Sequence, residues 1–314
     1  MVERSAATVT TPGEHPAPES LEFPGCRPLR IPRAEISDYE GRIEYWDAAT
    51  EIAMVCEPIS TYHELPGQRL ARLLTTIAHL RGSPIETFGA ADLLVRDIHG
   101  DHLRILEADQ TVYLHPRATR PWGAAIEVGS DALPDVVLEV DNTTDVRRGK
   151  LALYESWGFP EVWVEVPDTA SPSRPAGLRP GLTIHALDDR RFRTEPSSRA
   201  FPGWTSREIH RALNEAELSH ATMAALRRVA RTLGAAEGTG PDDDPLLAAE
   251  RMEGRRETQA VAVLQVFTTS GLPVSAALRR RLAELEGVST AALVQAALEC
   301  RDEPHYLRLV RERG

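Results

Sequence analysis

The chain is almost without lysine. Lys150 is the only lysine among 36 basic residues, and the remainder are arginines. A bias that replaces lysine by arginine nearly everywhere has left this one position unchanged, which favours a need for a compact ammonium group there. Chance or drift is the alternative explanation.

Cysteine and long hydrophobic runs are also scarce. The three cysteines, Cys26, Cys56 and Cys300, lie far apart with no metal-ligand spacing. We therefore expect a reducing cytoplasm, without a disulfide framework or a zinc site. No apolar stretch approaches the ~20 residues that span a bilayer, and the N-terminal residues lack the apolar core of a signal peptide. These absences predict a cytoplasmic protein that does not enter membranes.

Positive charge is in deficit as well. The net charge is −11 and the isoelectric point is near 5.5. Proteins that coat nucleic acid non-specifically rely on basic surface, so that class is disfavoured. A nuclease with a local basic groove around an acidic metal site remains compatible with the charge.

The length of 314 residues allows one good-sized domain and a smaller appendage. Residues 1–30 are rich in Pro, Ser, Thr and Glu and predict a flexible tail. Residues 31–204 alternate strand and helix patterns, whereas residues 205–314 have the Ala, Leu, Arg and Glu composition of helices, with a flexible break at 234–245. The Asp242–Asp244 run in that break is interpreted as a solvated linker and not as a metal site. Strands are expected at 39–45, 51–56, 85–88, 93–98, 102–106, 110–114, 124–128, 136–140, 161–166, 182–187 and 191–194. Helices are expected at 66–80, after Asp145, and at 206–214, 217–233, 246–268, 274–285, 289–299 and 303–312.

The stretch Leu133–Asp168 predicts strand, capped helix, turn and strand. Val136–Val140 is a β-branched, nearly all-apolar run that suits a strand buried on both faces. Glu139 interrupts this run, and a carboxylate there is costly unless it is paired, hydrogen-bonded or bound to a cation. Glu139 is therefore a candidate site residue, with a structural ion pair to a nearby arginine as the alternative. The length of the connection predicts a right-handed crossover between two parallel strands.

Several features of this stretch resemble the Uma-two family of restriction-endonuclease-like proteins, which belongs to the PD-(D/E)XK nuclease superfamily. They are the run Pro-Asp-Val-Val-Leu-Glu-Val ending at Val140, the Lys-x-x-x-Tyr step formed by Lys150 and Tyr154, and the segment Gly158–Asp168. The resemblance implies an α/β (α+β) fold, a mixed-sheet core flanked by helices, with an all-α C-terminal extension. It implies a metal-dependent endonuclease that hydrolyses phosphodiester bonds in DNA with Mg²⁺ or Mn²⁺.

The resemblance also implies residue roles. Asp109 and Glu139 would be the catalytic metal ligands, and Lys150 would be the catalytic lysine. In the superfamily pattern the lysine stands two residues after the acid, but here that position is Asp141, and Lys150 matches the place where the Uma-two group has its lysine. Asp141 and His63 are possible accessory residues.

Alternatives remain for these positions. Asp109 could be a turn residue before a strand, since the family's preceding proline is missing, and His63 could be a cap or packing residue. Glu44 and Glu64 are further candidate acids. Arg147 and Arg148 are expected to contact phosphates of the DNA backbone. Asp135 is excluded from sharing one metal with Glu139, because four residues of extended strand place them roughly 13 Å apart.

Three hypotheses follow. The first is a DNA endonuclease, and the second is a catalytically inactive nuclease fold that serves as a binding or scaffold module. The third is a structural ion network of Asp109, Glu139 and Lys150 in an unrelated domain. A homodimer and a protein partner for the helical tail are further expectations.

Overall fold

The structure, a computed structural model, describes residues 21–56, 61–119, 123, 125–142, 145–172, 174–175, 177–284 and 288–313. Most of the expected N-terminal tail, and residues 143–144 of the stretch Leu133–Asp168, lie outside these residues. The chain divides into two compact units, one ending at Gly240 and the other beginning at Pro241. No helix in the described ranges is both long enough and apolar enough to cross a membrane.

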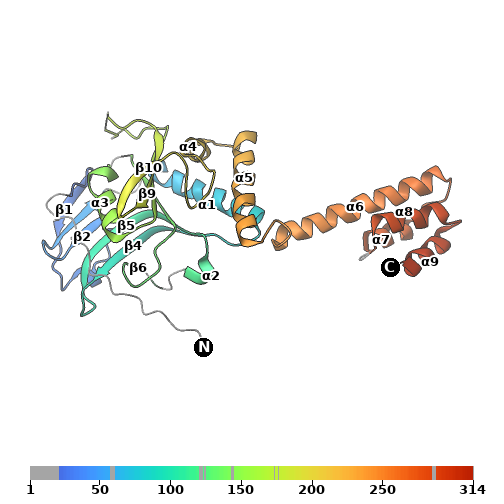
Figure 1. The fold of residues 1–314 in the computed structure, drawn as a ribbon, viewed down its shortest axis with the longest axis horizontal. Coiled ribbons are helices and arrows are strands. Elements are labelled where there is room, and N and C mark those ends of the chain that lie inside the picture. The colour runs from blue at the N-terminus through green and yellow to red at the C-terminus, as the bar shows by residue number, and fades with distance from the viewer. Residues whose placement is uncertain are drawn as a thin grey trace. The chain divides into compact units, whose positions relative to one another are not determined.

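The first unit contains a ten-stranded mixed sheet (Figure 1). Its longest path runs β1-β3-β2-β5-β7-β8-β9-β10, while β4 pairs with β5 and β6. The pairs β7–β8 and β4–β6 are parallel, and the other pairs are antiparallel. The strands are β1 (Cys26–Arg30), β2 (Tyr45–Asp47), β3 (Ile52–Cys56), β4 (Glu86–Arg96), β5 (His102–Tyr113), β6 (Ile126–Glu127), β7 (Val136–Val140), β8 (Glu161–Val166), β9 (Gly181–Asp188) and β10 (Arg191–Glu195). The expected parallel pair around the central stretch is confirmed as β7 and β8.

Helices cover both faces of this sheet. On one face α1 (Thr61–Arg81), α4 (Ser206–Asn214) and α5 (His220–Glu237) bury apolar residues against β7, β8 and β9. On the other face α3 (Lys150–Trp157) packs over a cluster that includes Val137, Val162 and Leu106. Helices α4 and α5 thus share the core of the sheet unit, although their composition resembles that of the C-terminal helices.

Local sequence explains where several of these elements start and stop. The apolar residues Leu70, Leu73, Leu74 and Ile77 of α1 recur at helical spacing and are fully or almost fully buried. Helix α4 begins with a capping box between Thr205 and Glu208. These features fix α1 and α4, two of the three helices on this face of the sheet.

Short helices connect the remaining elements of the first unit. They are η2 (Ile36–Asp38), α2 (Pro116–Thr119) and η3 (Val146–Arg148). Helix α3 follows η3 after a single residue, Gly149, and has eight residues. It stops at Gly158, which adopts a left-handed conformation with φ of 81° that a residue with a side chain would adopt only with strain.

The second unit is helical, as its composition predicts. It consists of α6 (Pro245–Thr269), α7 (Ala276–Glu284), α8 (Thr290–Glu299) and α9 (Glu303–Arg313). Its core forms around Val263, Phe267, Leu278, Leu293 and Tyr306. Asp244 caps α6 by accepting a hydrogen bond from Leu247 N, which gives part of the acidic run a structural role.

Some expected boundaries are wrong. The expected strands 85–88 and 93–98 form the single strand β4, and 102–106 and 110–114 form β5, because the long antiparallel pairing overrides local breaks such as Gly89. Helix α1 starts five residues before Pro66, which forfeits only one helical hydrogen bond near the helix start. The expected first strand, 39–45, is confined to Tyr45–Asp47.

The expectation of unpaired cysteines is also wrong. Cys26 and Cys56 form a disulfide, and Cys300 is free. The two residues are far apart in sequence, but antiparallel pairing of β1 with β3 places them opposite each other. The separation of the two cysteines in sequence therefore gave no indication that they are neighbours in the sheet.

Candidate functional site

The candidate site lies where β5 changes its neighbour. Strand β4 pairs along nearly the whole length of one edge of β5, so β2 and β7 share the other edge. The β5–β7 ladder ends at Gln110 opposite Leu138, and the β5–β2 ladder starts at Leu106 opposite Tyr45. Between these points β5 faces the gap from the end of β7 to the start of β2. We call this gap, with Glu44, Glu107, Asp109, Glu139 and Lys150, the strand junction.

Lys150 is the centre of the strand junction. It is the first residue of α3, and its Nζ donates to Glu139 Oε2 at 2.8 Å and to the main-chain oxygen of Glu107 at 2.7 Å. Glu44 Oε1 lies 2.5 Å from the same Nζ. These contacts use all three donors of an ammonium group. The one lysine of the chain is thus buried and fully coordinated, which fits a need for a compact ammonium group at this position.

Glu139 lies almost completely inside the protein, with 1% of its surface exposed. Its second oxygen accepts a hydrogen bond from the Tyr154 hydroxyl, one helical turn after Lys150. Burial raises the pKa of Glu139 well above its usual value, against the opposing effect of the Lys150 charge. Burial alone would lower the pKa of Lys150, but the charges of Glu139, Glu44 and Asp109 raise it well above its usual value. The ion-pair partner of Glu139 is therefore Lys150 and not an arginine.

Asp109 lies within β5, so its alternative interpretation as a turn residue before a strand is wrong. Its Oδ2 accepts a hydrogen bond from Val140 N at 2.7 Å, just beyond the end of the β5–β7 ladder. His63 Nε2, from the first turns of α1, lies 3.4 Å from the same oxygen. The side chains of Asp109 and His63 are 9% and 18% exposed, so they form the more accessible side of the junction.

Charge at the junction is unbalanced. The carboxylates of Glu44, Asp109 and Glu139 surround the single ammonium of Lys150, which leaves a formal excess of two negative charges. Buried charge of one sign is costly unless a counter-charge is present. The oxygen donors suit a hard divalent cation such as Mg²⁺, which needs only one or two carboxylates. Among the described residues no group of three or more His, Cys, Asp or Glu has the arrangement of a metal site, so any cation here would rely on at most two of these side chains.

Glu107 and its partner Arg42 were not anticipated at the junction. The carboxylate of Glu107 pairs with Arg42, whose Nε donates at 2.5 Å, while burial raises the pKa of Glu107. Glu107 interrupts the apolar pattern of β5 just as Glu139 interrupts that of β7, and this signal was available in the sequence. Glu44 was only one of several candidate acids, because it lies before a short strand whose pairing with β5 had no sequence signal.

The other candidate residues lie beside the junction and not in it. Asp141 Oδ1 accepts a hydrogen bond from Val146 N at 2.9 Å, and burial raises the pKa of Asp141 to about 7. Arg147 donates to Asp145 from both Nε and Nη2, and Arg148 pairs with Glu22. Both guanidinium groups expected to contact phosphates therefore have acidic partners within the chain.

Asp135 and Glu64 lie outside the junction. Asp135 Oδ2 accepts a hydrogen bond from Leu114 N at 2.7 Å, so it has a structural role, in keeping with its exclusion as a metal partner of Glu139. Glu64 lies exposed in the first turn of α1.

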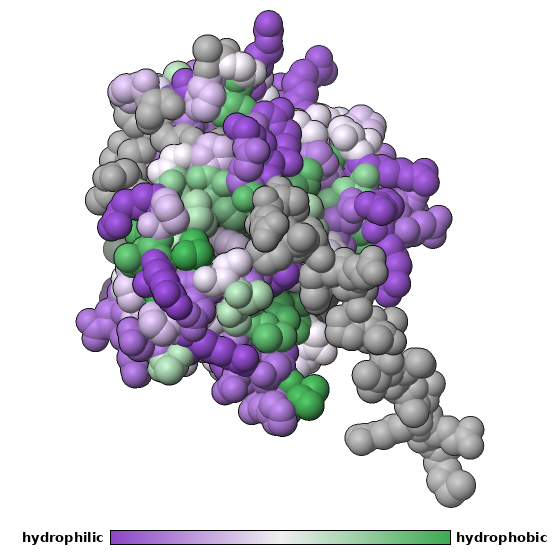
Figure 2. All heavy atoms as spheres, turned by 90° about the vertical axis from the view of Figure 1, so that its left-hand side faces the viewer, coloured by the Kyte–Doolittle hydropathy of each residue, from purple (hydrophilic) through white to green (hydrophobic). Residues whose placement is uncertain are grey.

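The surface over the β1 and β2 end of the sheet is mixed in character. Figure 2 shows hydrophobic side chains gathered toward the middle of this face among hydrophilic ones.

Comparisons with protein-family models, with curated proteins and with solved structures gave no match.

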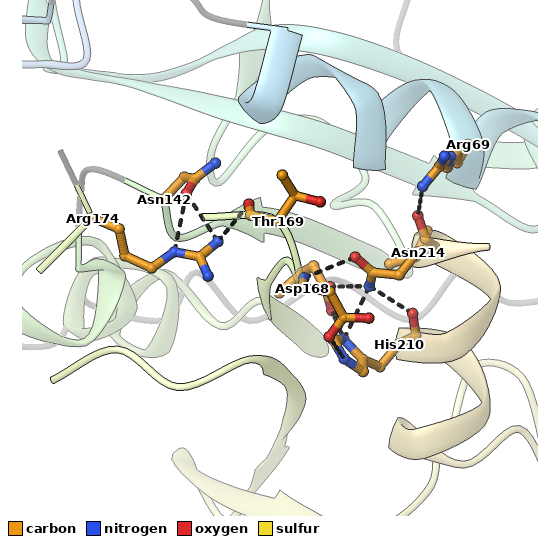
Figure 3. Close-up of polar contacts among 9 residues, drawn as sticks. Arg69, Asn142, Asp168, Thr169, Arg174, His210 and Asn214 are labelled. Carbon is orange, nitrogen blue, oxygen red and sulfur yellow. Dashed lines mark hydrogen bonds and ion pairs between the residues drawn. The ribbon is translucent and has the colours of Figure 1, made fainter. Parts of the chain in front are cut away.

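A second polar cluster lies at the carboxyl end of β8, on the face covered by α4 (Figure 3). His210 Nδ1 lies 2.8 Å from an oxygen of the buried Glu165, and its Nε2 lies 3.2 Å from Asp168 Oδ1. Asn214 donates to the same Glu165 at 2.8 Å. With a carboxylate at each ring nitrogen, the doubly protonated imidazolium is favoured, and the hydrogen bond that His210 Nδ1 donates to Glu165 raises the pKa of His210.

We expect this cluster to make stability depend on pH. Because the folded pKa of His210 is raised, its contribution is fully present below the usual histidine value of 6.5 and is lost as pH rises through the folded value. Burial also raises the pKa of Glu165, so this residue acts in the same direction. The imidazole is partly exposed, so the expected loss is only roughly 1 kcal/mol. The nearby Arg174 stays charged over this range.

The measurement is urea unfolding of wild type and of His210→Gln at pH 6 and pH 8.5. The wild type should lose more unfolding free energy over this interval than the variant does. Equal losses would show that the cluster does not titrate as described.

Proposed function

We propose that the chain is a metal-dependent endonuclease of the restriction-endonuclease-like fold that hydrolyses phosphodiester bonds in DNA. The observation that carries this proposal is the strand junction itself. It brings together a lysine, two carboxylates from adjacent strands and a third carboxylate, and these groups carry an excess of negative charge. These are the residue types that metal-assisted hydrolysis requires.

Each residue has a role in this proposal. Asp109 and Glu139 would hold Mg²⁺ or Mn²⁺ through their oxygens, which are ligands that such hard cations prefer. A bound cation would stabilise the developing negative charge and lower the pKa of the attacking water. Lys150 would orient that water and offset charge on the phosphate. Tyr154 and Glu44 would position Glu139 and Lys150 through the contacts they make with them.

Access to the junction favours entry beside Asp109 and His63. Glu139 and Lys150 are 1% and 3% exposed, whereas the side chains of Asp109 and His63 reach the surface. Lys150 would have to release one of its carboxylate partners when Glu139 turns towards a cation. The excess negative charge supports such an exchange, since a cation would lower the electrostatic cost at the junction.

The burial of Glu139 and Lys150 also supports a second candidate function. In a catalytically inactive nuclease fold, the ion network would serve only to join α3 to the sheet, and the protein would act as a binding or scaffold module. The exposed apolar side chains Val261 and Leu298 on the helices of the second unit suit contact with a protein partner or with a second copy of the chain.

The experiment is cleavage of supercoiled and single-stranded DNA with Mg²⁺ or Mn²⁺. We expect the wild type to cut in the presence of metal and not in EDTA. Asp109→Asn removes a ligand charge at the accessible side of the junction while preserving an acceptor for Val140 N. It should lower the rate by at least 100-fold, as should Lys150→Ala and Glu139→Ala.

Asp188→Asn is the matched control, because Asp188 lies on β9, pairs with Arg193 and takes no part in the junction. This variant should cut like the wild type. Absence of metal-dependent cutting by folded wild type, together with no metal binding in a calorimetric titration, would favour the scaffold function instead.

A further inference from the structure

A cavity lies beside the strand junction, at the ends of β7 and β8 and under the loop that leads into β9. Its volume is about 280 Å³, and its lining includes Asp141, Arg147, Val164, Leu178, Arg179 and Thr183. Asp141 follows Glu139 by two positions, which corresponds to about 7 Å along an extended strand. The cavity is therefore close enough to the junction to hold a neighbouring part of the same substrate.

Asp141, which lines this cavity, is a buried carboxylate with one oxygen that lacks a hydrogen-bond partner among the described residues. It is completely buried, and its Oδ1 is used by Val146 N, but its Oδ2 has no hydrogen-bond partner among the described residues. A buried carboxylate oxygen without a partner is costly. A ligand that carries a hydrogen-bond donor would satisfy it.

Two arginines, Arg147 and Arg179, also line the cavity and bring positive charge to it. Arg179 is exposed and forms no ion pair or hydrogen bond with any described residue. Arg147 is partly engaged by Asp145, yet an arginine has five donors and Asp145 accepts from only some of them. The rim can therefore receive an anionic group such as a phosphate.

We propose that this cavity is the subsite for one nucleotide of the strand bound at the junction. Its phosphate would lie against Arg179 and Arg147, and an amino group of its base would donate to Asp141 Oδ2. Acidic side chains accept hydrogen bonds from the amino groups of bases, as with cytosine N4. At about 280 Å³ the cavity lies just below the range of about 300–1,000 Å³ that is typical of small-molecule sites, so it can hold no more than one nucleotide.

This inference rests on the proposed nuclease function for its substrate, but its binding test does not need cleavage. The full-length protein is titrated calorimetrically in EDTA with deoxycytidine monophosphate and, separately, with a short single-stranded oligodeoxynucleotide. Both probes should bind the wild type. Arg179→Ala should weaken binding of each about tenfold, and with the oligonucleotide it should reduce the salt slope by about one.

Two further variants sharpen the test. Asp141→Asn presents an amide NH₂ in place of an acceptor oxygen. It should weaken the binding of deoxycytidine monophosphate about tenfold and change the binding of inorganic phosphate little. Arg190→Ala removes an exposed arginine in the turn between β9 and β10 that does not line the cavity, and it should leave affinity unchanged. Melting curves of all variants separate a lost contact from a lost fold.

The possible outcomes distinguish a failure of the subsite from a failure of the nuclease function. If neither probe binds, or if Arg179→Ala and Arg190→Ala bind alike, the subsite is overturned even when the wild type cuts DNA. If the oligonucleotide binds through Arg179 and Asp141 but the mononucleotide does not, the subsite holds for a strand and not for a free nucleotide. If binding depends on both residues while no metal-dependent cutting occurs, the subsite stands and the nuclease function fails.

Discussion

Replacing Lys150 by methionine is expected to lower the free energy of unfolding by about 3–5 kcal/mol. The substitution keeps much of the side-chain volume but leaves Glu139 and Glu44 buried without their cation. The main-chain oxygen of Glu107 loses its donor as well. Removing one partner of a buried ion pair costs more than the pair itself contributes, because the remaining charge is uncompensated.

Urea unfolding of four proteins measures this effect: wild type, Lys150→Met, Glu139→Gln and the double variant. In Glu139→Gln the amide oxygen can still accept from Tyr154, so the loss should be smaller than for Lys150→Met. The double variant removes both charges and should recover at least about 1 kcal/mol relative to the sum of the single losses. Simple additivity of the two losses would contradict the pairing of these residues.

The same double variant separates structure from chemistry. If the junction were only a structural ion network, a double variant that still folds would keep whatever function the protein has. A catalytic junction predicts the opposite, because neither methionine nor glutamine can perform the proposed roles of lysine and carboxylate. We expect the double variant, assayed under conditions in which its melting curve shows it folded, to show no DNA cleavage.

The central part of this junction could be predicted from sequence, for an identifiable reason. Glu139 interrupts an otherwise apolar strand, and Lys150 is the only lysine of the chain, so each stands out against its background. Their meeting follows from the short strand–helix–strand connection, in which the start of α3 returns to the end of β7. Local patterns were sufficient here because the two partners are only eleven residues apart.

Long-range partners were harder to predict. Glu44 and the main-chain oxygen of Glu107 reach Lys150 because β2 and β7 share one edge of β5, and no local pattern encodes that arrangement. The pairing of Cys26 with Cys56 depends likewise on the register of β1 with β3. Non-local strand pairing is set by the packing of the whole sheet, which single-sequence periodicity does not contain.

That disulfide leads to the second large effect. Reduction of the Cys26–Cys56 bond is expected to lower the free energy of unfolding by about 3–4 kcal/mol, because the bond closes a chain segment 30 residues long in the unfolded state. Urea unfolding with and without dithiothreitol measures it. Dithiothreitol should destabilise the wild type and Cys300→Ser equally, whereas the double variant Cys26→Ser, Cys56→Ser should not respond to it.

A thiol count tests the bond directly. Protein unfolded without reductant should show one reactive thiol, that of Cys300, and three after reduction. Three thiols before reduction would contradict the disulfide. If the count is one in protein isolated under thiol-blocking conditions, the bond exists in the cell, and persistent disulfides are rare where glutathione and thioredoxin keep thiols reduced. The reducing cytoplasm expected from cysteine spacing would then be wrong, because that expectation rested on the two cysteines being far apart, whereas the sheet places them together.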